Sequence, residues 1–165
     1  MVSRLCRPSS AGPCVSTSPP LKGLDRLPDR YEITVADLQR AMERAGLQMH
    51  EGDIVLVRTG KIRDFDNEPA FQAAEPGVGR MAALWLYENG MSVLGTDTTG
   101  TEPLPFKDPA LTTHRAMLIE SGVHLIENVN LEEVAKAGVR EGLFIALPLK
   151  IAGATGSWLR PILVI

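Results

Sequence analysis

Short apolar runs alternate with segments of helical periodicity along most of the chain, and no other feature of the sequence constrains the fold as strongly. The runs at 54–57 and 92–95 are bounded by glycine, aspartate or asparagine, as buried strands usually are. Before the first run, Thr34 is placed as the N-cap of a helix over 35–45, with Asp37 in its first turn. Strands that alternate with helices in this way predict an α/β domain.

The other periodic segments extend the same pattern. A second helix is predicted over 78–88, with Met81, Leu84 and Trp85 on one apolar face, and a polar loop is predicted over 61–76. Further short elements are helices at 114–120 and 131–135 and strands at 123–126, 143–147 and 159–165. The sequence has no internal repeats, so these elements are expected to form one domain.

Composition and charge argue against several classes of protein. The 165 residues are 44% apolar and 22% charged, which is ordinary for one globular domain with a sizeable core. The net charge of −3 does not favour a nucleic acid or an anionic membrane as partner, and no apolar run approaches the roughly 18 residues that span a bilayer. Cys6 and Cys14 both lie near the N-terminus, so neither a disulfide framework nor a cysteine zinc site is supported. We expect a reducing, cytoplasmic setting.

Several short segments occur in an order that is typical of one protein family. They are Tyr31-Glu32-Ile33-Thr34, Gly52 to Gly60, Pro76-Gly77-Val78, Gly95-Thr96-Asp97-Thr98, His114 with Ile126-Glu127-Asn128, Leu147-Pro148-Leu149-Lys150, and Thr155-Gly156-Ser157 before Arg160-Pro161. Together, over residues 23–165, these segments resemble the cyclase family, whose members include kynurenine formamidase and isatin hydrolase.

The resemblance implies a swivelling β/β/α fold, a homo-oligomer and a divalent metal ion at the active site. It also implies hydrolysis of a small-molecule amide, either a formamide or a ring lactam, as in the arylformamidase step of tryptophan catabolism. In such a reaction a metal-activated water attacks the carbonyl, which the same ion polarises. A reading without catalysis stays open, in which the chain is a truncated remnant or a small-molecule binding module.

Two metal ligands are implied by the resemblance. The family's chief metal motif, HxGTHxDxP, is absent, and no histidine precedes His50. His114 and Glu127 match the downstream ligand pair, and an imidazole with a carboxylate suits zinc or manganese. Two ligands from one chain are too few for a tight site. Without the resemblance, the sequence favours a helix-capping or partly buried histidine at His114 and a solvated turn residue at Glu127. No catalytic residue is identified.

A further candidate is the loop that carries Asp97 and Thr98 at the end of a predicted strand. Asp97 is either a turn former or a group that orients the active site from this loop. His50 and His124 are expected to be structural or exposed rather than catalytic. Trp85 is expected to belong to the core.

Residues 1–22 differ from the rest and are set apart as a non-family segment before an incomplete, N-terminally truncated domain at 23–165. They are rich in serine, proline and cysteine and have no acidic residue. Their arginines and serines would fit a transit peptide, but their prolines interrupt its amphipathic helix, and they lack the apolar region of a secretory signal. We hypothesise that residues 1–20 are translated out of frame and that the metal motif lies upstream in the DNA. A domain that lacks its first strands would expose sheet edges, so marginal folding is expected.

Overall fold

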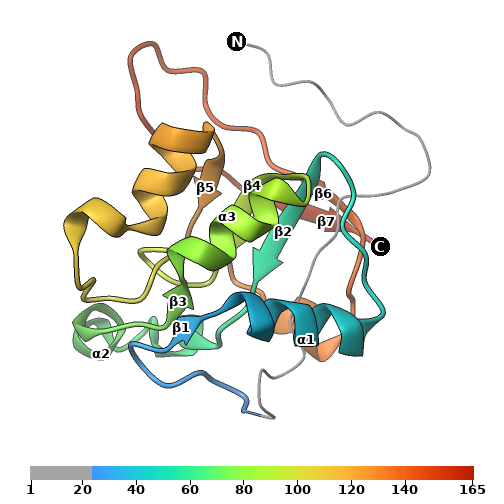
Figure 1. Cartoon of the computed structure of the whole chain (residues 1–165), viewed down its shortest axis with the longest axis horizontal. Helices are drawn as coiled ribbons and strands as arrows, with labels where there is room; N and C mark the ends of the chain where they lie inside the picture. The colour runs from blue at the N-terminus through green and yellow to red at the C-terminus, as the bar shows by residue number, and fades with distance from the viewer. Residues whose placement is uncertain (1–23) are drawn as a thin grey trace.

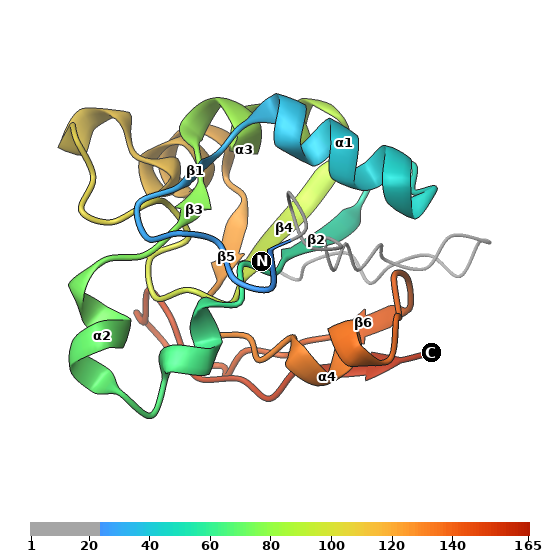
Figure 2. The same ribbon diagram turned by 90° about the horizontal axis from the view of Figure 1, so that it is seen from below.

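The elements of the computed structural model, which describes residues 24–165, are arranged in layers around a parallel sheet (Figure 1). The sheet has the strand order β2 (Asp53–Val57), β4 (Met91–Thr96) and β5 (His124–Ile126). Helices α1 (Val35–Ala45) and α3 (Arg80–Glu88) cover one face (Figure 2). The opposite face carries α4 (Glu132–Lys136) and an antiparallel ribbon of β6 (Leu143–Ile145) and β7 (Ile162–Val164). This arrangement confirms the α/β class.

Strand β2 is buried on both faces, which explains why its sequence is an unbroken apolar run. Val55 and Val57 belong to the core cluster that includes α1 and α3. Leu56 points the other way and packs with Leu131 and Phe144 near the ribbon, because successive side chains of a strand point to opposite faces. Each of these three β2 side chains is at most 2% exposed.

Helix α1 forms where the local signals predict it. Thr34 and Asp37 make a reciprocal capping box, in which each side chain accepts a hydrogen bond from the other residue's main chain. Gly46 ends the helix in the left-handed region at φ 68°, where glycine has no Cβ penalty.

Two predictions for the middle of the chain are wrong. The expected polar loop at 61–76 contains a 3₁₀ helix, η2 (Lys61–Asp64), and an α-helix, α2 (Glu68–Ala73), because Phe71 is buried there. In α3, Met81 is 69% exposed, whereas Ala82 and Ala83 are buried in the core cluster.

Strands β1 (Glu32–Ile33) and β3 (Gly77–Val78) pair in parallel beside the main layers, so α3 begins later than predicted. A 3₁₀ helix, η3 (Pro109–Leu111), precedes a π-helix, η4 (Arg115–Ser121). No helix within residues 24–165 is long and apolar enough to cross a membrane. The prediction for residues 1–22 lies outside the described residues.

Candidate metal centre

The loops that follow the three parallel strands meet at one edge of the sheet, where α/β proteins commonly place their sites. The loop after β5 is tied to the end of β4 by two main-chain hydrogen bonds. The N–H of Asn128 donates to the carbonyl of Thr98 at 3.0 Å, and the N–H of Val129 donates to the carbonyl of Thr96 at 3.0 Å. Glu127 is therefore held next to the segment that leaves β4.

His114 lies between two carboxylates at this edge, at the residue before the π-helix η4. Its Nδ1 is 2.5 Å from Oε2 of Glu102, and its Nε2 is 3.3 Å from Oε1 of Glu127. Glu102 also accepts the main-chain N–H of His114 at 3.2 Å. The structure thus brings together the two residues that the resemblance paired, and π-helices often occur at functional sites.

The two carboxylates favour the charged form of the imidazole. The hydrogen bond to Glu102, and after it the one to Glu127, raise the pKa of His114 to about 10, although partial burial acts in the opposite direction. Each ring nitrogen of His114 therefore has its own carboxylate partner, and the ring orientation is fixed at both ends.

Glu102 was not singled out from the sequence, although it is the stronger partner of His114. Its side chain is 8% exposed, and it lies in the loop after β4 together with Thr101. Thr101 Oγ1 donates to Oε1 of Glu127 at 3.1 Å, so this one loop contacts both members of the pair. Thr101 has φ 45°, a strained value for a β-branched residue of the kind that clusters at functional sites.

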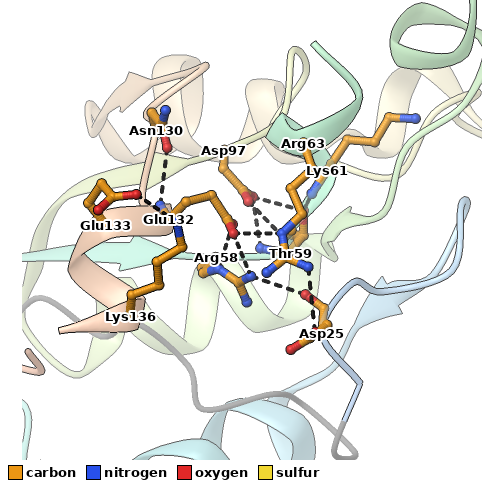
Figure 3. A network of polar contacts seen from close by, with 11 residues as sticks. Asp25, Arg58, Thr59, Lys61, Arg63, Asp97, Asn130, Glu132, Glu133 and Lys136 are labelled. Atoms are coloured by element: carbon orange, nitrogen blue, oxygen red, sulfur yellow. Dashed lines mark hydrogen bonds and ion pairs between the residues drawn. The ribbon is translucent and has the colours of Figure 1, made fainter. Parts of the chain in front are cut away.

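Asp97 is buried and binds the neighbouring loop rather than His114. Its carboxylate accepts the N–H and the hydroxyl of Thr59, both at 2.8 Å, and the N–H of Gly60 at 2.7 Å (Figure 3). Burial raises the pKa of Asp97, while these donors and the charge of Arg58 oppose the rise. Thr98 is also buried, and its hydroxyl donates to that of Thr96 at 3.0 Å. The geometry gives both residues contacts that fix loops at the sheet edge.

An ion-pair network anchors the segment after β2 to α4. Nε and Nη2 of Arg58 donate to the two oxygens of Glu132 at 2.7 and 3.0 Å, and Nε of Arg63 reaches the same carboxylate at 2.6 Å (Figure 3). Burial raises the pKa of Glu132, but the hydrogen bonds from Arg58 and Arg63 outweigh it and hold the pKa below its ordinary value. The network joins the end of β2 to α4, the element that follows the Glu127 loop.

A family model described as putative cyclase matches residues 12–103, which is more than half of the chain. The chain belongs to this cyclase family. The match begins inside the N-terminal segment that was set apart at 1–22, so the boundary of the domain stays a prediction. A curated relative, the kynurenine formamidase of Bacillus cereus (strain ATCC 10987 / NRS 248), is 32% identical over 112 residues. That alignment covers 66% of this chain and 48% of the relative, so the chain spans about half the length of the curated protein.

Solved structures of the cyclase family share the fold. A novel cyclase superposes with a TM-score of 0.80 at 30% identity, over 92% of this chain and 53% of that one. Isatin hydrolase A from Ralstonia solanacearum gives a TM-score of 0.67 at 26% identity, over 81% and 52% of the two chains. A potential metal-dependent hydrolase with cyclase activity gives 0.59 at 28% identity, over 83% and 59%. The predicted family and its fold are therefore confirmed.

The donor set around His114 suits part of a zinc or manganese site. A metal-binding histidine usually donates its second ring N–H to a carboxylate, and Glu102 holds Nδ1 of His114 in this way while Nε2 faces Glu127. Within residues 24–165, no group of three or more histidine, cysteine, aspartate or glutamate side chains could hold a metal ion. The described residues thus fit two ligands and one orienting carboxylate, but not a complete site.

The other two histidines lie elsewhere, as expected. The side chain of His50 is 54% exposed, and its Nδ1 lies 3.8 Å from Oδ2 of Asp53. His124 is exposed on β5. Trp85 packs against the core cluster and is partly buried. Among residues 24–165, neither of these histidines forms a hydrogen bond or ion pair with His114, Glu102 or Glu127, so they serve as controls for it.

Proposed function

We propose that this chain carries part of the metal centre of a hydrolase that cleaves amide C–N bonds in a small molecule, with His114 and Glu127 as two of the metal ligands. The observation that carries the proposal is the arrangement of the imidazole, whose Nδ1 is held by Glu102 while its Nε2 faces Glu127. Names of similar proteins support the reaction class, since they include a kynurenine formamidase, an isatin hydrolase and a metal-dependent hydrolase.

The roles of the three side chains follow from their chemistry. A neutral imidazole and a carboxylate are ligands that zinc and manganese accept. A bound ion would lower the pKa of a water molecule and polarise the amide carbonyl of a formamide or a lactam. Because Glu102 and Glu127 favour the charged ring in the metal-free chain, a metal ion would have to displace the Nε2 proton of His114. Glu102 would then hold the remaining Nδ1 proton and keep Nε2 turned toward Glu127. Thr101 would hold the carboxylate of Glu127 through the 3.1 Å hydrogen bond.

The remaining ligands are proposed to come from outside residues 24–165, because no group of three or more histidine, cysteine, aspartate or glutamate side chains within these residues could hold a metal ion. The chain spans 48% of the length of the Bacillus relative, which is consistent with a site that needs further residues. We also propose that the protein works as a homo-oligomer in the cytoplasm. Exposed apolar side chains near the C-terminus, such as Leu147 at 74% and Trp158 at 92%, support association with another copy.

Hydrolysis of N-formylkynurenine and of isatin by the purified full chain, supplied with Zn²⁺ or Mn²⁺, tests this function. We expect metal-stimulated hydrolysis in the wild type that is lost in Glu127→Gln. The matched control is Glu133→Gln, because the side chain of Glu133 is 83% exposed and pairs with Lys136 at the surface. A wild-type chain that binds metal but hydrolyses neither amide would contradict the proposed reaction.

A second candidate is a non-catalytic role, as a remnant or a binding module of the same fold. It is favoured by the absence of a three-ligand metal group within residues 24–165. The two functions differ in one observable property. A binding module without metal would show no measurable affinity of the full chain for Zn²⁺ or Mn²⁺, whereas the hydrolase requires it.

A further inference from the structure

Glu75 is a buried carboxylate near the metal centre whose role the proposed function does not yet include. It lies between α2 and β3 and is 1% exposed. Its Oε2 accepts the N–H of Thr99 at 2.8 Å, and its Oε1 accepts the N–H of Gly100 at 2.6 Å. A carboxylate this deeply buried requires donors of this kind, and here both donors belong to the loop after β4.

The main chain of Glu75 holds the other end of the same loop. Its N–H donates to the carbonyl of Leu104 at 3.2 Å, and its carbonyl accepts the N–H of Leu104 at 3.0 Å. One residue therefore fixes the loop at 99–100 and again at 104. Between these two anchors lie Thr101, which contacts Glu127, and Glu102, which contacts His114.

The residues that follow Glu75 also lie close to the main chain of the 99–104 loop. The N–H of Val78 donates to the carbonyl of Thr101 at 2.8 Å. A Cβ on Gly77 would collide with the main chain of Thr101 and Glu102, and one on Gly100 would lie 2.9 Å from Oε1 of Glu75. The main chain of residues 75–78 therefore packs closely against the loop at 99–104.

We propose that Glu75 is a positioning residue of the metal centre, which fixes the 99–104 loop so that Glu102 orients His114 and Thr101 orients Glu127. Glu75 acts through these residues and contacts neither member of the His114–Glu127 pair by a hydrogen bond. The expected effect of Glu75 on metal affinity rests on the proposed function. Its expected effect on the His114–Glu102 hydrogen bond does not depend on that function.

The test replaces Glu75 by glutamine, which keeps the size of the side chain but turns one acceptor into a donor. An amide N–H of Thr99 or Gly100 then faces an NH₂ group, and that end of the loop is released. Glu68→Gln is the matched control, because Glu68 accepts one exposed hydrogen bond from Gln72. The readouts are the NMR resonance of the His114 Nδ1 proton in the metal-free full chain and the dissociation constant for Zn²⁺.

In the wild type and in Glu68→Gln, we expect a strongly deshielded Nδ1 proton that is protected from water by Glu102. In Glu75→Gln this resonance broadens or disappears, and the dissociation constant for Zn²⁺ rises about 10- to 100-fold, as for other outer partners of metal ligands. Amide resonances of β2 and β4 report whether the variant is folded. The Cβ of Gly100→Ala would lie 2.9 Å from Oε1 of Glu75 and 2.9 Å from Cδ1 of Leu104, so this variant disturbs the same anchors without removing the carboxylate. It is expected to cause a smaller change in the same direction and covers the case in which Glu75→Gln does not fold.

A folded Glu75→Gln variant with an unchanged Nδ1 resonance and unchanged Zn²⁺ affinity would overturn the inference. A wild-type chain that fails to bind Zn²⁺ would contradict the proposed function instead. The proton resonance would still decide the role of Glu75 in that case, because it is measured without metal.

Discussion

Replacing Glu132 by glutamine tests the ion-pair network that joins the end of β2 to α4. The side chains of Arg58 and Glu132 are only 6% and 14% exposed, and removing one partner of a buried pair costs about 3–5 kcal/mol. Glutamine keeps one acceptor oxygen and the site is not fully dry, so we expect a loss near the lower limit, about 3 kcal/mol. The adjacent Glu133 pairs with Lys136 at 83% exposure, and Glu133→Gln is expected to cost under about 1 kcal/mol.

Urea denaturation of the wild type and the two variants, followed by circular dichroism, measures their free energies of unfolding. Thermal denaturation followed by the same signal measures their Tm. For a chain of this size, about 1 kcal/mol corresponds to a shift of about 2–4 °C in Tm, so Glu132→Gln is expected to lower Tm by about 6–12 °C. Free energies of unfolding that agree within about 0.5 kcal/mol between the two variants would refute the reasoning.

The contribution of Glu132 to stability depends on pH, because Arg58 and Arg63 lower the pKa of its carboxyl group in the folded chain. This contribution is fully present above the unfolded pKa of about 4.3 and is lost as the pH falls through the lower folded value. Glu132→Gln should lack this part of the acid dependence.

Three further substitutions give expected outcomes by the same urea assay. Asp97→Ala leaves the buried N–H groups of the Thr59–Gly60 turn without an acceptor and should cost about 2–4 kcal/mol; a loss below about 1 kcal/mol would contradict this. Asp37→Asn should cost about 1–2 kcal/mol at neutral pH. Burial raises the pKa of Asp37, but hydrogen bonds to its carboxylate, those of the capping box first, hold it below its ordinary value, so the difference from wild type should shrink as the pH falls below about 4. Trp158→Ser should change the stability of the monomer by less than about 0.5 kcal/mol, because Trp158 is 92% exposed.

The elements whose limits depend on residues close by in the sequence could be predicted from the sequence. The capping signal at Thr34 and the stop at Gly46 are local, and α1 begins and ends where they place it. The run at 54–57 is apolar throughout because β2 is covered on both faces. By contrast, the helices within 61–76 depend on tertiary packing of Phe71, which no local pattern reveals.

The candidate site was predictable only in part. His114 and Glu127 were paired by resemblance to the cyclase family, since neither their spacing nor their composition indicates a site. Glu102 and Glu75 act through contacts that the fold creates between distant segments, so their residue types alone carry no signal. Asp97 follows the end of β4, but its partners lie in the loop after β2, which only the parallel pairing of β2 with β4 brings close.

Zn²⁺ titration of the full chain, comparing His114→Asn with His124→Asn by calorimetry, tests the central claim most directly. The two variants remove the same functional group from the same chain, once beside Glu102 and Glu127 and once from the exposed face of β5. The account predicts that His114→Asn weakens Zn²⁺ binding by at least about tenfold while His124→Asn leaves it unchanged. Equal affinities in the wild type and both variants would contradict a metal centre at His114.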